Sequence, residues 1–88
     1  MIAETKNSLH QKDKAEHIEE WITSYVANLL EVDAEEIDPT IPFDRYGLDS
    51  SAAVGMTGDL EDWLGREIDP TMIYDYPTIK ALAECLSS

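Results

Sequence analysis

The sequence contains little that would cross-link the chain or hold a metal. Its 88 residues include one cysteine, Cys85, so an intramolecular disulfide is excluded and a zinc cluster lacks the ligands it needs. No apolar run is long enough to cross a bilayer, and the N-terminus lacks the apolar stretch of a signal peptide. We therefore expect a cytoplasmic protein that does not bind membranes.

Positive charge is scarce as well. Six basic side chains stand against 19 acidic ones, for a formal net charge of −13. Three of the six lie in the first 14 residues, so residues 15–88 hold 17 acids against three bases and carry −14. Such a field repels nucleic acids and attracts basic protein surfaces. Because acidity also serves solubility alone, only a specific site can identify the partner.

The length of the chain suits a single small domain. Eighty-eight residues leave no room for a second core, and a rigid catalytic cleft is hard to build in so small a body. We therefore expect a protein that is not an enzyme, and separately we expect it to be a monomer. Residues 1–14 are polar and have no hydrophobic period. This composition predicts a mobile polar leader, followed by the folded domain over residues 15–88.

The strongest helical pattern begins at Ala15. Apolar residues recur there at the spacing of one helical face, namely at Ile18, Trp21, Ile22, Tyr25, Val26, Leu29 and Leu30. Residues 31–48 contain Pro39, Pro42 and Gly47, which oppose a continuous helix. We predict an ordered loop there, held across the core by its own apolar residues: Val32, Ile37, Ile41, Phe43 and Leu48.

Three further helices follow this loop. Asp49 or Ser50 can cap the second helix, which ends at Gly65. Its expected core face consists of Ala53, Met56, Leu60, Trp63 and Leu64. A short helix is predicted over residues 71–74 and a last one after residues 76–78, with Ile79, Leu82, Ala83 and Leu86 as its buried stripe. The fold class is therefore all-α: a four-helix bundle of three main helices and one short one, with a long first loop.

Ser50 is the residue with the most chemical interest. It stands at a helix start beside an acid, where a serine is more often a cap than a functional group. Nucleophilic catalysis would require a base, and the two histidines, His10 and His17, lie in or near the leader. A serine hydrolase is therefore not expected. One alternative is an acidic helical interaction module without a cofactor, in which Ser50 only caps the helix.

The residues around Ser50 resemble a known family. Gly-Leu-Asp-Ser at 47–50 is similar to the attachment motif of acyl carrier proteins, and the resemblance extends from about residue 15 to residue 86. It includes Ile-Asp-Pro, Phe-Asp-Arg-Tyr, Leu-Glu-Asp-Trp-Leu-Gly and Tyr-Asp-Tyr-Pro-Thr, which begin at residues 37, 43, 60 and 74. The resemblance implies a non-catalytic carrier whose 4′-phosphopantetheine, taken from coenzyme A, is joined to Ser50 through a phosphodiester.

The same resemblance implies partners and a cargo. Asp49 and the Asp-Tyr-Pro-Thr segment look like those of polyketide-synthase carriers, with a peptidyl carrier of a nonribosomal peptide synthetase as the alternative. Asp49 would help a phosphopantetheinyl transferase to place magnesium and coenzyme A. An acyl-activating ligase or acyltransferase would load the arm, and a ketosynthase would use the acyl group.

A partner-binding surface is also implied by the resemblance. The family often has a large apolar residue where this chain has Ser51 and a glutamate where it has Gly55. We therefore expect close, weakly charged contacts near Ser50, with charge pairs further along the helix. The expected surface consists of Leu48, Ser51, Val54, Gly55, Asp59, Glu61, Asp62 and Ile73. Val54, Met56, Leu60 and Ile73 are candidates to shelter an acyl chain, with plain core packing as the alternative.

Overall fold

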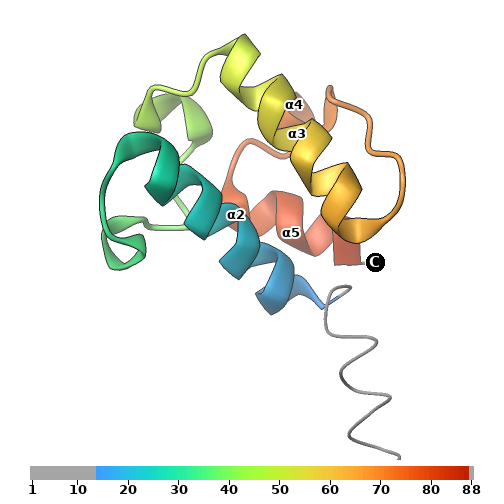
Figure 1. Cartoon of the computed structure of the whole chain (residues 1–88), viewed down its shortest axis with the longest axis horizontal. Helices are drawn as coiled ribbons and strands as arrows, with labels where there is room; N and C mark the ends of the chain where they lie inside the picture. The colour runs from blue at the N-terminus through green and yellow to red at the C-terminus, as the bar shows by residue number, and fades with distance from the viewer. Residues whose placement is uncertain (1–13, 88) are drawn as a thin grey trace, which may run out of the picture.

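The computed structural model describes residues 14–87 and contains four α-helices in that range. They are α2 (Ala15–Leu30), α3 (Ser50–Leu64), α4 (Met72–Asp75) and α5 (Ile79–Ser87). Helices α2 and α5 pack against each other, and α3 crosses the other side of the core (Figure 1). Residues 14–87 form no strand, although Pro42 and Thr78 make an isolated bridge. The predicted all-α bundle is confirmed, with the short helix one residue later than predicted.

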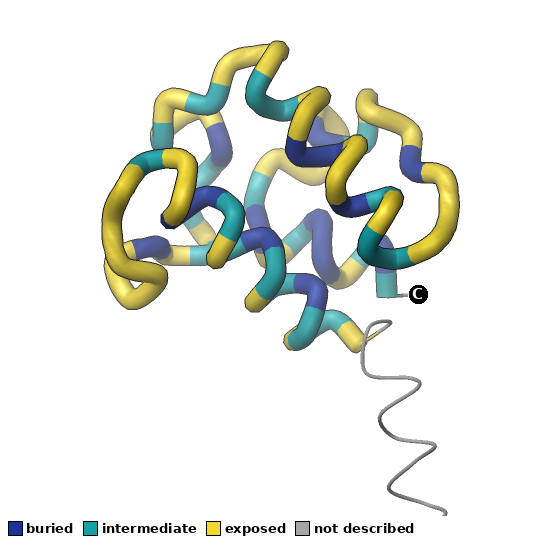
Figure 2. Tube along the Cα trace, viewed as in Figure 1, coloured by how far each residue is buried: buried dark blue, intermediate teal, exposed yellow. Residues whose placement is uncertain are grey.

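The core lies between these helices and the long loop (Figure 2). Its fully buried large side chains are Ile18, Ile22, Val26, Met56, Leu60, Ile79 and Leu82. Thr57 is buried as well, and its hydroxyl donates a hydrogen bond to the Ala53 carbonyl at 2.9 Å, which satisfies the polar group inside the core.

Leu29 corrects the expected face of α2. Trp21 stacks on Tyr25 and on Trp63 of α3, with ring centroids 5.4 and 5.6 Å apart. Leu29 continues the row formed by Trp21 and Tyr25 one turn beyond this stack, and there it is 47% exposed. Val32, expected to hold the loop on the core, is also 38% exposed. Trp21 and Tyr25 are therefore partly buried, whereas Leu29 at the end of the same row is exposed.

The long loop after α2 is ordered by burial and by hydrogen bonds. It is not free of helix, because it contains two 3₁₀ turns, η2 (Ala34–Glu36) and η3 (Phe43–Tyr46). Ile37 and Phe43 are buried in the core. The Tyr46 hydroxyl accepts from the Asp38 N–H at 2.6 Å and donates to the Asp38 carbonyl at 3.0 Å. These contacts thus fix the conformation of the loop that leads to Ser50.

The segment between α3 and α4 is held by side chains as well. The Glu61 carboxylate accepts a hydrogen bond from the Ile68 N–H at 2.6 Å, and Ile68 is buried. The Arg66 guanidinium donates to the carbonyl of Leu86 near the end of α5.

No helix within residues 14–87 has both the length and the apolar character of a membrane span. The leader predicted for residues 1–14 lies outside the described residues, apart from Lys14.

Candidate functional site

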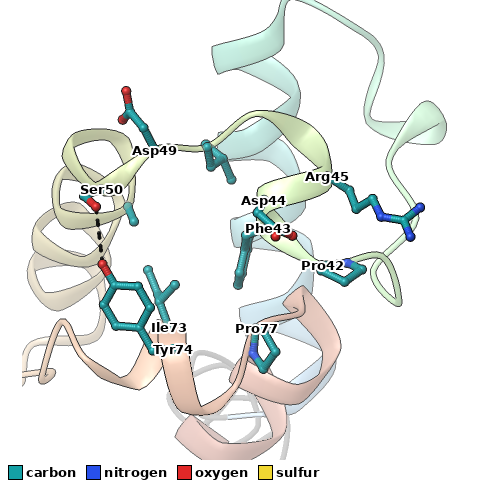
Figure 3. Close-up of a pocket in the computed structure, with 11 residues that line it drawn as sticks. Pro42, Phe43, Asp44, Arg45, Asp49, Ser50, Ile73, Tyr74 and Pro77 are labelled. Carbon is teal, nitrogen blue, oxygen red and sulfur yellow. Dashed lines mark hydrogen bonds between the residues drawn. The ribbon is translucent and has the colours of Figure 1, made fainter.

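Ser50 is the first residue of α3, and Asp49 is the residue that caps this helix. The Asp49 Oδ1 atom accepts a hydrogen bond from the Ala52 N–H at 2.9 Å. Asp49 and Ser50 are both exposed. Because Asp49 performs the capping, the Ser50 hydroxyl is not used for it; Figure 3 shows this hydroxyl directed toward Tyr74 of α4.

A glycine turn delivers the chain to this position. The 3₁₀ turn η3 ends at Gly47, whose φ of 79° lies in the left-handed region that favours glycine. The Gly47 N–H donates to the Asp44 carbonyl at 3.1 Å, which closes the turn. Leu48 is half-buried and packs against the core. The turn and this apolar contact together place Asp49 and Ser50 at the surface.

Ser50 lies at the edge of a hollow of about 660 Å³. Four separate segments line this hollow: η3, the start of α3, α4 and the connection to α5 (Figure 3). The lining residues are Pro42, Phe43, Asp44, Arg45, Leu48, Asp49, Ser50, Ala53, Ile73, Tyr74 and Pro77. An exposed hydroxyl beside a largely apolar hollow fits a long covalent arm that carries an apolar group.

Helix α4 forms one wall of this hollow. The Asp69 carboxylate accepts from the N–H and the hydroxyl of Thr71, at 2.9 and 2.8 Å, in the turn before α4. These two bonds hold the pKa of Asp69 below its usual value. Ile73 is 8% exposed and anchors α4 in the core, whereas Tyr74 is 69% exposed. The Tyr74 hydroxyl lies 3.4 Å from the Ser50 Oγ atom.

The structure changes the set of residues that lines the hollow. Of the four expected side chains, only Ile73 lines it. Met56 and Leu60 are 0% and 1% exposed within the core, and Val54 is 55% exposed. Apart from Ile73, the lining residues outside α3 were not expected to shelter an acyl chain, because no periodic signal connects η3, α4 and the segment after it.

The expected partner surface is divided by the structure. Ser51, Val54, Gly55, Asp59 and Asp62 are exposed along α3. The other three members are covered or engaged, since Leu48 and Glu61 are half-buried and Ile73 is buried.

One residue of that exposed surface is also engaged with α2. Burial raises the pKa of Tyr25, and its hydrogen bond with the Asp59 carboxylate raises this pKa further. A Cβ atom at Gly55 would lie 3.7 Å from the same Tyr25 hydroxyl, an ordinary contact. The middle of α3 therefore presents Gly55 and Asp59 beside the Tyr25 phenol.

With this geometry in view, residues 20–86 match the family model described as the phosphopantetheine attachment site. The chain belongs to this family of carrier domains. It is 36% identical to the acyl carrier protein TtuC of Teredinibacter turnerae over 84 residues, covering 96% of this chain and 97% of that protein. Polyketide synthase PksL of Bacillus subtilis is 28% identical over 85 residues, but the carrier domain spans only 2% of that synthase.

Solved carrier structures share the fold. A free-standing peptidyl carrier protein from Acinetobacter baumannii has a TM-score of 0.78 and 44% identity, over 84% of this chain and 92% of that one. The acyl carrier protein Asl1650 from Anabaena sp. PCC 7120 has a variant phosphopantetheinylation-site sequence. Its TM-score is 0.80 and its identity 43%, over 84% of each chain.

Family membership confirms the cofactor and the non-catalytic character expected from the sequence. The prosthetic group of this carrier domain is 4′-phosphopantetheine. The domain is related both to carriers of polyketide synthases and to peptidyl carrier proteins. Carriers of this family work with phosphopantetheinyl transferases and acyl-processing enzymes. The cofactor-free interaction module has no support from these relatives.

Proposed function

We propose that this carrier domain holds acyl intermediates as thioesters on a 4′-phosphopantetheine arm attached to Ser50. The position of Ser50 carries the proposal: its hydroxyl is exposed, stands first in α3 and lies beside the 660 Å³ hollow. The bound group supplies a terminal thiol that forms the thioester. The carrier would move this acyl group between enzymes of polyketide or other lipid-derived biosynthesis, where tethering gives a high effective concentration.

Attachment needs little from the carrier itself. The Ser50 oxygen would bond to the β-phosphorus of coenzyme A, adenosine 3′,5′-bisphosphate would leave, and the serine proton would pass to a base of the transferase. The Asp49 carboxylate is adjacent to Ser50, and carboxylate oxygens are ligands that magnesium takes, which suits Asp49 to help place the transferase's magnesium ion. The apolar lining of the hollow, Phe43, Ile73 and Pro77 included, would shelter part of an acyl chain.

The exposed part of α3 is the proposed docking surface for partner enzymes. Asp59 and Asp62 are exposed, and residues 15–88 carry a formal charge of −14. Acidic surfaces raise the association rate with basic partner patches without fixing the complex tightly, which suits a shuttle. The partners would be a phosphopantetheinyl transferase, an acyl-activating ligase or acyltransferase, and a ketosynthase. The monomeric state and the cytoplasmic location stay predictions.

The attachment site is tested by intact mass. The chain is incubated with coenzyme A, magnesium and a promiscuous phosphopantetheinyl transferase, beside Ser50→Ala and Ser51→Ala. The neighbouring serine is a matched control, because it is also exposed in the first turn of α3. We expect one phosphopantetheine on the wild type and on Ser51→Ala, and none on Ser50→Ala. A gain on Ser50→Ala would move the arm elsewhere, and no gain on the folded wild type would reject the proposal.

A peptidyl cargo is the second candidate, favoured by the 44% identity to the free-standing peptidyl carrier of Acinetobacter baumannii. The modified domain is offered in parallel to an acyl-adenylating ligase with fatty acids, an acyltransferase with malonyl-coenzyme A, and an amino-acid-adenylating enzyme. Intact mass then reports which thioester forms. Loading with fatty or malonyl groups supports the acyl proposal, whereas loading with amino acids alone would replace it by the peptidyl one.

The docking surface is tested at Gly55. Partners are expected to make close, weakly charged contacts with this part of α3, and a glutamate would add bulk and a charge there. Gly55→Glu should therefore weaken turnover with the chain's own partner enzymes. Gly55→Ala is the control, because its Cβ meets only an ordinary contact at 3.7 Å. Unchanged turnover by Gly55→Glu would show that partners do not approach this part of α3 closely.

A further inference from the structure

Tyr74 gives Ser50 a hydrogen-bonding partner from another helix. The two hydroxyl oxygens are 3.4 Å apart and belong to residues 24 positions apart in the chain. Both residues are exposed, and the dashed line in Figure 3 shows Tyr74 directed toward the serine at one side of the hollow. The backbone of Tyr74 is held by its neighbour, since Ile73 is only 8% exposed. The phenol therefore starts from a fixed backbone position and lies close to the proposed attachment oxygen.

The chemistry of attachment fixes the direction of this bond. In the unmodified chain either hydroxyl is able to donate to the other. Once Ser50 carries a phosphodiester its oxygen has no hydrogen, so only the Tyr74 hydroxyl can donate. The two non-bridging phosphate oxygens stand two bonds from the serine oxygen and share a negative charge. A charged oxygen is a stronger acceptor than a neutral hydroxyl, so the phenol would turn toward them.

Two N–H groups at the start of α3 are already engaged. The Ala52 N–H donates to the Asp49 carboxylate at 2.9 Å, and the Ala53 N–H donates to the Asp49 carbonyl, also at 2.9 Å. The Asp49 carboxylate adds a negative charge beside the position where the phosphate would be. A neutral hydrogen-bond donor from α4, such as the Tyr74 hydroxyl, is therefore well suited to bind the phosphate oxygens there.

We propose that Tyr74 is a positioning residue, whose hydroxyl holds the Ser50 oxygen before transfer and the phosphodiester afterwards. This inference rests on the proposed attachment at Ser50. The hydrogen bond would restrain the base of the arm at the edge of the hollow, while the rest of the arm stays mobile. Tyr74 would thereby bias where the thioester end lies relative to the hollow.

The test compares Tyr74→Phe with Tyr76→Phe in the modified state. Both variants lose one phenolic oxygen from the same segment, but the Tyr76 hydroxyl is hydrogen-bonded to Cys85 and not to Ser50. The arm contributes the one phosphorus atom of the protein, so ³¹P NMR reports its surroundings directly. We expect the ³¹P resonance to move by more than its line width in Tyr74→Phe and to stay in place in Tyr76→Phe.

The rate of transfer gives a second readout. The kcat/KM for modification of Tyr74→Phe should fall by about two- to tenfold, the range of one neutral hydrogen bond. The melting temperature should not change, because phenylalanine keeps a ring that is 69% exposed. If the arm is attached but Tyr74→Phe changes neither the ³¹P resonance nor the transfer rate, the inference is overturned. A wild type without any phosphorus signal would instead reject attachment, and the inference with it.

Discussion

Helices α2 and α3 have similar lengths, but α2 shares its buried face with α5 and the pair supplies more of the core than α3 does. In its 16 residues α2 buries Ile18, Ile22, Val26 and Ala27, and the nine residues of α5 packed against it bury Ile79, Leu82, Ala83 and Leu86. In its 15 residues α3 buries Met56, Thr57 and Leu60 and contains two glycines.

The proposed attachment site lies on the more lightly packed side. Ser50 is in the exposed first turn of α3, and α4, which carries Tyr74, has four residues. The α2–α5 pair supplies most of the buried apolar side chains, whereas α3 and α4 surround the hollow. Local opening is easiest where few apolar contacts hold an element. The molecule thus separates a well-packed pair of helices from a side that exposes the proposed attachment site.

The sharpest test of this contrast is the loss of a core side chain from α2. Ile22 is 0% exposed, so Ile22→Ala should lower the free energy of unfolding by about 2–5 kcal/mol. Val54→Ala on α3 should lower it by less than about 0.5 kcal/mol, since Val54 is 55% exposed. Urea unfolding followed by circular dichroism measures both. Equal losses at the two sites would contradict the contrast, and Ile22→Val serves if the alanine variant does not fold.

Two substitutions of Asp49, at the start of α3, should distinguish its role as a helix cap from its role in recognition by the transferase. Asp49→Ala removes the acceptor for the Ala52 N–H and should cost about 1 kcal/mol of stability. Asp49→Asn keeps a capping oxygen and should stay within about 0.5 kcal/mol of the wild type. Both variants should lower the kcat/KM of the transferase by about tenfold, because both lose the carboxylate charge. Transfer by Asp49→Asn at the wild-type rate would show that Asp49 is only a cap.

The glycines inside α3 and at its end should respond to alanine with opposite signs. A Cβ atom added at Gly58 or at Gly65 would meet no atom within 4 Å, so space does not limit either substitution. Gly58 is inside the helix, where alanine should raise the free energy of unfolding by about 1 kcal/mol. Gly65 has a φ of 75°, where alanine should lower it by about 1 kcal/mol. Thermal unfolding of both variants decides, and a loss in Gly58→Ala would indicate an unrecognised need for glycine there.

The smallest expected effect concerns pH and the contact between α2 and α3. Burial and the hydrogen bond with Asp59 raise the pKa of Tyr25 above its ordinary value of 10.0. The folded state then holds the phenolic proton more tightly than the unfolded state does. This contribution is complete below pH 10 and is lost as the pH rises through the higher pKa of the folded state.

Tyr25→Phe should therefore show a weaker loss of stability above pH 10 than the wild type. Urea unfolding at several alkaline pH values measures this difference. Some loss should remain in the variant, because the hydrogen bond with Cys85 raises the pKa of Tyr76 as well. Identical pH profiles for wild type and Tyr25→Phe would show that the phenol does not couple the two helices.

Much of the architecture follows from local patterns. The recurrence of apolar residues predicted α2, α3 and α5, because one face of an amphipathic helix must be buried. The same pattern was wrong for Leu29, which the spacing assigns to the core although it is 47% exposed. Periodicity shows which residues share a face, but it does not show how far along the helix a neighbouring element covers that face.

The candidate site also has a part that the local sequence predicts and a part that it does not. Its motif, Gly47 to Ser50, is local, and so is the choice between two capping residues that the sequence left open. A 2.9 Å hydrogen bond from Ala52 decides that choice in favour of Asp49. Thr57 was not expected in the core, because its side chain carries a polar hydroxyl. The structure shows that this hydroxyl is satisfied by a hydrogen bond to the Ala53 carbonyl, which makes its burial possible.

Order along the chain was enough to predict the helices, since helix periodicity, capping and turn chemistry act over a few neighbouring residues. The resemblance of its motifs was enough to predict the family, and it proposes Ser50 as the attachment site. The hollow beside Ser50 and the contact between Ser50 and Tyr74 depended on the tertiary structure. Those features join η3, α3 and α4, and the two residues in contact are 24 positions apart. Such segments are brought together by burial of the shared core, which no local pattern records.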